Sequence, residues 1–478
     1  MTERVITDED MDREVLATYG NEAFLSPEYL EAEKRLLWPK VWQMVERLED
    51  LPDVGDWLTY NVADESVIVV RVAEGDGGDA FRAFHNVCPH RGRQLVSVPD
   101  HLPGLNSKSD QPVHSVRGKN RKNFICGFHG WTFNTEGENT YILDPQDWQN
   151  RLTPDLTCLS TVKVGTWGGY IYINMDPDSE TLESFMGRAG EILSHFELSK
   201  MRYKWRQWAI YPCNWKTAIE AFLEPYHVAG THTQLLAYGN YYALSKQYGW
   251  HSVSSYDTRD VEFQMNEASG TTRAGKGDDP RSSTYELIRE NYETVNFSAS
   301  TETLVNAASR LVEELPEGTP AQEVIAHWMA SAKADDAKRG VIWPEIPGEV
   351  MAEAGLAWGL WPNQNILHGV TFALCYRVRP YGDDPNKCVF ESYALERFPE
   401  GEVPETEWVY AAPTAENWGS VLEQDFSNME FVQKGMKSSG FRRTLPNPHQ
   451  EQKVINLHRN LARMMEGRGA PKPLFPVN

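Results

Sequence analysis

The chain has 478 residues, of which 41% are hydrophobic and 24% charged, so it can bury a large core, and its length allows two or three domains. A formal net charge of −22 argues against nucleic acid and anionic membranes as partners. The charged start lacks the features of a secretory signal, and no run of about 18 apolar residues occurs. We therefore expect a cytoplasmic protein whose six scattered cysteines bind metal or stay buried as thiols.

The first third of the chain indicates a helix followed by strands. A serine, a proline and a periodic apolar face predict a helix in residues 26–38, within a helical arm of residues 1–45. Short runs rich in β-branched and aromatic residues follow at 57–62, 66–72, 81–87, 123–133 and 167–175. This pattern predicts a small antiparallel β domain over residues 46–175. Inside it, the polar stretch 99–123 has the composition of a solvated loop or hairpin extension.

The remaining residues, 176–478, mix both kinds of pattern and predict a larger α+β domain. We expect helices at 179–196, from about Asn214, at 302–338 and, as the last helix, at 420–437, with strands at 205–212, 372–381 and 388–398. We expect the segment 302–338 to be a packed helix pair, and a lid over a pocket is the alternative.

Two turns in the β domain each offer one thiolate and one imidazole. Cys88 and His90 stand in the first turn, and Cys126 and His129 in the second. Two cysteines and two histidines form the ligand set of a Rieske [2Fe-2S] cluster, whose potential of roughly −150 to +300 mV suits an electron carrier. The alternative is a zinc site, which usually pairs cysteine with cysteine and histidine with histidine.

A second metal site is indicated near the middle of the chain. His227 and His232 are five residues apart, Glu224 comes three residues before the first histidine, and Glu220 seven before it. A helix that loosens after His227 could direct both imidazoles at one point. With a carboxylate they would form a facial triad that binds iron(II) and leaves positions open. Two buried histidines in the core are the competing interpretation.

In their order along the chain these motifs resemble the large, catalytic α subunits of Rieske ring-hydroxylating oxygenases. The resemblance is carried by the motifs CPHRG at 88–92, CGFHGW at 126–131, NWK at 214–216 and HVAGTH at 227–232, with GDW at 55–57, WGGYIYINM at 167–175 and Pro362-Asn363. It implies an N-terminal arm (1–45) packing on the catalytic domain, a Rieske domain (46–175) and a helix-grip (START-like) catalytic domain with an antiparallel sheet (176–478). It also implies Asp425 as the third iron ligand, with Glu423 in reserve.

The resemblance further implies how electrons reach the iron. Electrons from NAD(P)H would pass through the flavin of a separate reductase, and through a ferredoxin if one is used, because no G-x-G-x-x-G motif follows a strand here. Many family members have Asp where this chain has Glu224. That carboxylate would link the cluster of one subunit to the iron of its neighbour, which implies a ring such as a homotrimer and leaves a β subunit open. The long interval after His90 would place the loop 99–123 beside the cluster, where its basic residues could orient an acidic donor.

The substrate is the least determined part. Hydroxylation or dihydroxylation of an aromatic, apolar ring with O₂ is our first expectation. A monooxygenase or demethylase acting on a quaternary ammonium or methoxylated compound is the alternative, since aromatic side chains bind such cations. An alternative function from a different class of protein is a non-catalytic iron–sulfur redox sensor, which would keep the cluster but would not carry out oxygenase chemistry.

Overall fold

The computed structural model describes residues 4–97, 114–237, 242–256 and 279–475. The chain divides into two compact units, one of residues 31–185 and one of the residues up to 30 together with those from 186 onward. The divisions fall inside the helices α3 (Pro27–Leu36) and α5 (Leu182–Ser194), so the expected arm of residues 1–45 is shared between the units. Within the described ranges, no helix combines the length and the apolar character needed to span a membrane.

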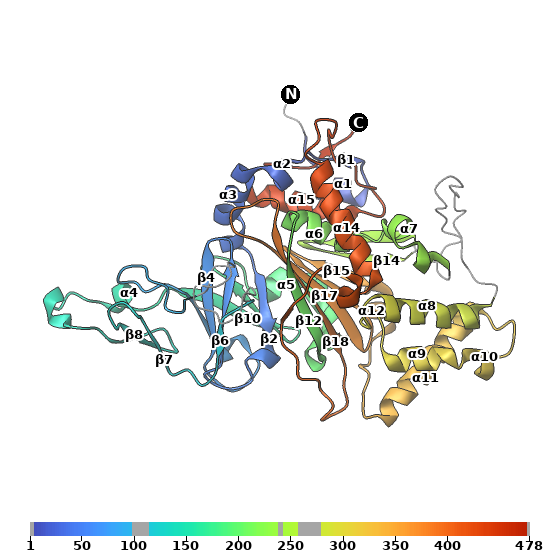
Figure 1. Ribbon diagram of the computed structural model, residues 1–478, viewed down its shortest axis with the longest axis horizontal. Helices are drawn as coiled ribbons and strands as arrows, with labels where there is room; N and C mark the ends of the chain where they lie inside the picture. Colours follow the sequence, from blue (N-terminus) through green and yellow to red (C-terminus); the bar gives the residue numbers. More distant parts are fainter. Residues whose placement is uncertain (1–3, 98–113, 238–241, 257–278, 476–478) are drawn as a thin grey trace. The chain divides into compact units, whose positions relative to one another are not determined.

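The smaller unit contains a seven-stranded sheet in the order β2-β11-β10-β5-β4-β3-β6 and a three-stranded sheet β7-β8-β9 (Figure 1). The strands are β2 (Gln43–Arg47), β3 (Trp57–Val62), β4 (Glu65–Arg71), β5 (Phe81–His85), β6 (Arg117–Gly118), β7 (Asn123–Ile125), β8 (Thr132–Asn134), β9 (Asn139–Tyr141), β10 (Thr161–Trp167) and β11 (Tyr170–Asn174), with a short helix α4 (Pro154–Thr157). Their pairings are antiparallel, as the alternating sequence pattern predicts.

Most of the polar stretch 99–123 lies outside the described residues. Its predicted role beside the cluster therefore stays a prediction. Its final part is described. Arg117 and Gly118 form β6 and pair with β3. The guanidinium of Arg121 lies 4.6 Å from the ring centroid of Trp57, which is the distance of a cation–π contact.

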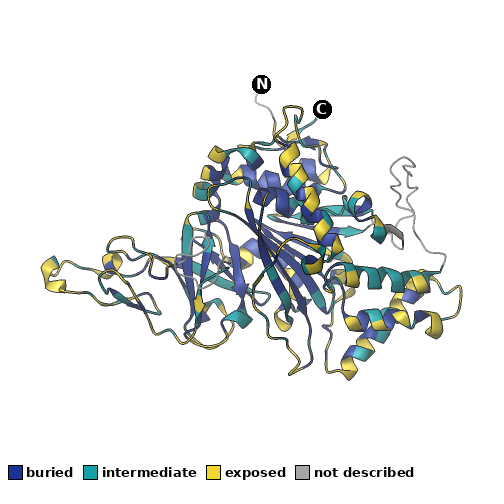
Figure 2. Ribbon diagram, in the orientation of Figure 1, coloured by how far each residue is buried: buried dark blue, intermediate teal, exposed yellow. Residues whose placement is uncertain are grey.

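The larger unit is built around an eight-stranded sheet in the order β13-β14-β15-β16-β17-β18-β12-β19. Its strands are β12 (Arg202–Tyr211), β13 (Ala243–Tyr248), β14 (His251–Tyr256), β15 (Ala357–Leu360), β16 (Gln364–His368), β17 (Phe372–Pro380), β18 (Cys388–Glu396) and β19 (Val409–Tyr410). Near the chain ends, β1 (Ala17–Thr18) pairs with β20 (Lys472–Pro473). The central hairpin β17–β18 is buried along almost its whole length (Figure 2), so both faces of the sheet are covered.

The helices of this unit lie on and around the sheet (Figure 1). They are α1 (Asp8–Asp12), α2 (Glu22–Leu25), α6 (Trp215–Leu223), α7 (Val228–Thr231), α8 (Pro280–Thr294), α9 (Glu302–Ser309), α10 (Leu311–Glu314), α11 (Ala321–Lys338), α12 (Gly348–Glu353), α13 (Ala415–Trp418), α14 (Ser420–Gly435) and α15 (Gln452–Met464). Helix α6 packs across β15 to β18, and α14 packs on α6. The Asn214 side chain caps α6 by accepting a hydrogen bond from the Lys216 N–H at 3.0 Å.

One helix prediction is borne out with added detail and one needs correction. The segment 302–338 is interrupted between Glu314 and Ala321, where two prolines stand, and its helices α9 and α11 pack together through Leu304, Ala307 and Ala332. The helix expected to be the last, at 420–437, is α14, and a further helix, α15, follows it. Helix α15 was not predicted, although Val454, Leu457 and Leu461 are buried at helical spacing; many of its other buried side chains are polar.

Candidate functional site

The four predicted cluster ligands lie in two loops that the chain folds in the same way. In the first loop the Cys88 N–H donates to the Arg93 carbonyl at 2.8 Å, and the Gly92 N–H donates to the Cys88 carbonyl at 3.0 Å. In the second loop Cys126 and Gly130 make the equivalent bonds at the same two distances. Both glycines adopt positive φ, +75° and +72°, a conformation in which a side chain is strained. A glycine four residues after each cysteine therefore gives two loops of matching backbone, although the histidine stands two residues after Cys88 and three residues after Cys126.

The two loops bring their side chains together over a buried core. Cys88 and Cys126 belong to the hydrophobic core of the smaller unit, and the rings of His90 and His129 meet with centroids 4.7 Å apart. Burial, together with the neighbouring Cys126 thiol, raises the pKa of Cys88 to about 11, against the backbone N–H groups of His90 and Arg91, which lower it. At neutral pH the Cys88 thiol is therefore protonated unless a bound metal holds it as a thiolate.

These residues fit a two-iron cluster better than a single ion. The buried Nδ1 atom of His129 has no hydrogen-bond partner, as a nitrogen reserved for a metal would. Among the described residues, the one group of His, Cys, Asp or Glu side chains whose donor atoms all lie within 4.8 Å of one another is elsewhere in the chain. The four donors of the loops thus do not converge as the ligands of one zinc ion do.

The converging group consists of His227, His232 and Asp425. Helix α6 ends at Leu223, since Pro225 disfavours helical backbone at Glu224, whose φ and ψ are −130° and 131°. The break therefore precedes His227, where we expected it to follow. His227 and His232 then flank the four-residue helix α7, which separates them by one turn and turns both rings toward α14, where Asp425 is buried.

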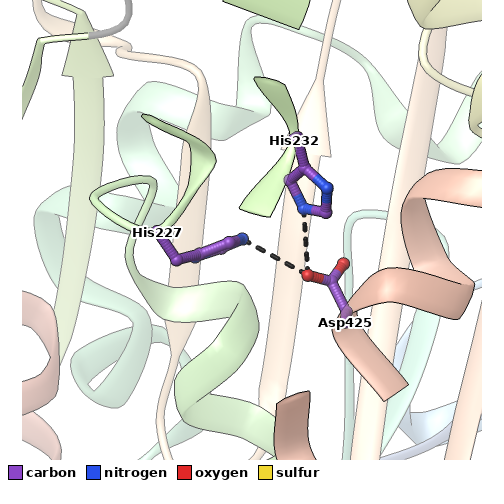
Figure 3. Close-up of side chains that lie close together, drawn as sticks. All are labelled: His227, His232 and Asp425. Carbon is purple, nitrogen blue, oxygen red and sulfur yellow. Dashed lines mark hydrogen bonds and ion pairs between the residues drawn. The ribbon is translucent and has the colours of Figure 1, made fainter. Parts of the chain in front are cut away.

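The three side chains meet at a single carboxylate oxygen (Figure 3). The Nε2 atoms of His227 and His232 lie 3.4 and 3.0 Å from Asp425 Oδ1, and the planes of the two rings are inclined by 77°. Two imidazole nitrogens and one carboxylate on one side of a point form the facial arrangement that binds iron(II). Glu423, the reserve candidate, lies on the same helix, but its side chain is exposed and it does not belong to this group.

Each histidine is oriented by a second hydrogen bond on its other nitrogen. His227 Nδ1 lies 2.9 Å from Glu224 Oε1, and His232 Nδ1 lies 2.7 Å from Gln424 Oε1. Gln424 Oε1 also accepts from Gln234 Nε2 at 3.0 Å, so its oxygen faces the ring and His232 Nδ1 carries the proton. Both Nε2 lone pairs are thereby left for a metal. Hydrogen-bond partners on the other ring nitrogen, such as Glu224 and Gln424, are usual for histidines that bind a metal.

The charges in the group depend on one another. Burial alone would lower the pKa of His227, but the charge of Glu224 and hydrogen bonds to Asp425 and Glu224 raise it well above its usual range. Burial would raise the pKa of Asp425, whereas its hydrogen bonds to His227 and His232 lower it. Without a metal, protonated imidazole takes the place of the cation that this carboxylate attracts.

A pocket of about 410 Å³ opens on the group. It is lined by α6, α7, α8, α14 and the sheet strands β14 to β17, and most of its lining side chains are apolar. No described residue of 302–338 lines it, so the packed-helix interpretation of that segment is the one that the structure supports. The strands β16 and β17 present Leu367, Leu374, Asn365 and Tyr376 to it as two cross-strand pairs.

The chain belongs to the family of ring hydroxylating α subunits, because the model of the catalytic domain of that family matches residues 197–467. The Rieske [2Fe-2S] domain model matches residues 41–150, which contain all four predicted cluster ligands. The α+β class of the fold and its two domain types are thus confirmed.

Relatives and solved structures of the same kind were found. The chain is 29% identical to the carnitine monooxygenase oxygenase subunit of Escherichia coli (strain K12), over 42% of this chain and 48% of that protein. It is 27% identical to the biphenyl 2,3-dioxygenase α subunit of Rhodococcus jostii (strain RHA1), over 43% and 41%. A crystal structure of a quaternary ammonium Rieske monooxygenase matches with a TM-score of 0.60 at 16% identity, covering 97% of this chain and 100% of that one. The chain spans about half the length of the curated relatives it matches.

Sequence reasoning missed several residues around the trio. Gln424 stands next to Asp425 in sequence, and a scan for acceptors beside the carboxylate could have found it. Asn365 and Tyr376 come from two strands whose pairing alone places them in the pocket, so no local motif indicates them.

Proposed function

We propose that this chain is the terminal oxygenase component of a multicomponent Rieske oxygenase. The observation that carries the proposal is the convergence of His227, His232 and Asp425 at the wall of a largely apolar pocket, in a chain that also has a Rieske domain. Cys88, His90, Cys126 and His129 would hold the [2Fe-2S] cluster, and the trio would hold iron(II). A reductase, with a ferredoxin if one is used, would supply the electrons.

When bound, the cluster supplies single electrons and the iron supplies the site at which O₂ is activated. In the net reaction, a C–H bond, O₂, two electrons and two protons give C–OH and water. The residues of the chain do the rest. Glu224 and Gln424 hold the imidazoles in one tautomer and orientation, and the apolar side chains of the pocket keep water from the reacting carbon.

Glu224 has a second proposed role as the link to a cluster on a neighbouring copy. Its Oε1 and Oε2 atoms face the His227 ring and backbone N–H, which leaves lone pairs for one further donor. A cluster histidine of a neighbouring subunit would fill that position and complete the electron path. Activity would then depend on an oligomer, for which a homotrimer is our expectation.

For the substrate we favour a quaternary ammonium compound over the aromatic ring that was our first expectation from sequence. A carnitine monooxygenase and a quaternary ammonium monooxygenase stand among the similar proteins, and a biphenyl dioxygenase keeps the aromatic ring as the second candidate. Oxidation of a carbon bonded to the ammonium nitrogen gives R₃N⁺–CH₂OH, which releases R₃N, formaldehyde and a proton.

Substrate-dependent O₂ consumption tests the proposal. The protein with both metal sites loaded is given NADH, a surrogate reductase and a panel of ammonium, aromatic and methoxylated compounds, and products are identified by mass. Consumption with one ammonium compound and a hydroxylated or dealkylated product is the expected result. Two irons per chain instead of about three, with no compound consumed, would point to the redox sensor.

A further inference from the structure

The charged side chains around the pocket restrict which substrates the proposed oxygenase can bind, and this inference rests on that proposed function. Two acidic residues, Glu224 and Asp425, stand among the described residues that line the pocket, and no Lys or Arg is among them. Both carboxylates are engaged by histidines. With a divalent metal on the trio, the two negative charges are balanced by the ion.

One buried lysine lies behind the pocket wall and does not line it. Lys453 Nζ donates to the Ala357 carbonyl at 2.9 Å and approaches Ser254 Oγ at 3.4 Å, while its side chain is 1% exposed. Ala357 and Ser254 themselves line the pocket. The wall therefore shields the ammonium group from the pocket, and a substrate carboxylate would meet no basic side chain of the described lining.

The hydrogen-bonding side chains of the wall, other than the two carboxylates and the histidines, are uncharged. They are Ser254, Ser255, Tyr256, Asn291, Asn365 and Tyr376. Asn365 is 2% exposed, its amide nitrogen donates to the Phe222 carbonyl, and its Oδ1 atom has no partner. A buried carbonyl-type oxygen without a partner is costly, and an uncharged donor on a ligand would satisfy it.

Tyr376 lines the same pocket as the trio. Its ring stacks on Phe222 with centroids 4.0 Å apart and an inclination of 25°, and it is the cross-strand partner of Asn365. Burial and the nearby charge of Asp425 raise the pKa of its hydroxyl well above the usual range, so the ring is neutral. Its hydroxyl makes no hydrogen bond to any residue in the described ranges.

We infer that the pocket selects an organic cation whose remaining part is uncharged, and that Tyr376 determines this specificity by presenting its ring to the cation. The carbon to be oxidised is bonded to the ammonium nitrogen, so the cation must lie near the trio, and Tyr376 is on the wall there. Cation–π attraction compensates for the lost hydration of a methylated ammonium group. A carboxylate on the same molecule would meet no basic side chain among the described lining residues, and burial of an unpaired charge is unfavourable.

Three compounds of nearly the same shape separate the contributions. Choline carries a cation and a hydroxyl, glycine betaine carries a cation and a carboxylate, and 3,3-dimethylbutan-1-ol replaces the nitrogen of choline by carbon. Binding is measured by anaerobic calorimetry on the loaded protein, and turnover by O₂ consumption with the surrogate reductase. We expect choline to bind at least about tenfold more tightly than either analogue.

Two variants of Tyr376 complete the test. Tyr376→Phe keeps the ring and loses the hydroxyl, so it should keep the preference for choline over its carbon analogue. Tyr376→Leu should raise the Kd and KM for choline by about tenfold and leave the carbon analogue nearly unchanged, with kcat affected less. Glycine betaine binding as tightly as choline, or an unchanged preference in Tyr376→Leu, would overturn the inference. Choline binding without O₂ consumption would support the inference while contradicting the proposed function.

Discussion

The Oε1 atom of Glu224 lies 2.9 Å from Nδ1 of His227, and its Oε2 atom accepts a hydrogen bond of the same length from the His227 backbone N–H. One carboxylate thus fixes both the ring and the backbone of a proposed iron ligand. It does so because Pro225 disfavours helical backbone at Glu224, so helix α6 ends at Leu223 and Glu224 is extended.

Glu224→Gln should remove the charge and one of the two acceptor oxygens. The amide oxygen can still accept from His227 Nδ1, while the bond from the His227 backbone N–H is lost, so we expect both metal sites to be loaded and the cluster to be reducible by dithionite. Product formation should fall by about a hundredfold, because the link between the cluster and the iron loses its charged acceptor. Glu423→Gln, an exposed neighbour of the trio on α14, should behave as the wild type. Normal turnover in Glu224→Gln would remove the link from the mechanism.

Asp425→Ala should abolish the mononuclear site and spare the cluster. The trio loses its carboxylate, and two imidazoles alone bind iron(II) weakly. We expect iron per chain to drop from about three to about two, with an unchanged Rieske EPR signal after reduction. The matched change Glu423→Ala should leave the iron content as it is. Loss of the cluster signal in Asp425→Ala would mean that the variant is misfolded, so the EPR measurement serves as the internal check.

His129→Cys should lower the reduction potential of the cluster. A third thiolate adds negative charge, and the potential should move from the Rieske range toward roughly −400 mV. Backbone hydrogen bonds of Cys126 and Gly130 close the loop around position 129, so we expect a cysteine there to allow incorporation of the cluster. Redox titration followed by circular dichroism measures the shift, with His85→Cys in the same unit as the control. An unchanged potential would exclude His129 as a ligand.

The sequence predicted ligands better than it predicted their surroundings. Cys88 and His90, and Cys126 and His129, are each adjacent in one loop, so local spacing is sufficient to recognise them. The strand run 57–62 was likewise found as β3. Asn365 and Tyr376 become neighbours only through the register of β16 and β17, which is a long-range property. Helix α15 was missed although Val454, Leu457 and Leu461 form an apolar stripe at helical spacing; buried polar side chains such as Gln452 and Lys453, which hydrogen-bond to backbone carbonyls, stand beside it.

Gln424→Leu should weaken the metal site without touching a ligand. Gln424 Oε1 holds the His232 ring by a 2.7 Å hydrogen bond, and loss of such a partner typically costs about 10- to 100-fold in metal affinity. Iron(II) titration of the apo trio measures the effect. Asn428→Ala, one turn further along α14, removes an exposed hydrogen bond to Thr231 and should change the affinity little. Equal affinities in both variants would show that Gln424 does not orient His232.

Lys453→Met should change how stability depends on pH. Burial lowers the pKa of Lys453 to about 7, although the charge of Glu224 acts in the opposite direction. In the unfolded chain the pKa of a lysine is about 10.4. Between these values the unfolded chain binds one proton more than the folded chain, so the free energy of unfolding rises with pH, by up to about 1.4 kcal/mol per unit.

The substitution removes that contribution. The gain of Lys453→Met in apparent Tm over the wild type should therefore be largest near pH 7 and shrink toward pH 10, while the loss of its hydrogen bonds to Ala357 and Ser254 adds a pH-independent offset. Thermal unfolding of the loaded protein at pH 7 and 9.5 provides the measurement. Lys437→Met, at an exposed position, should show no such trend, and a constant difference in Lys453→Met would mean that the lysine stays protonated inside the fold.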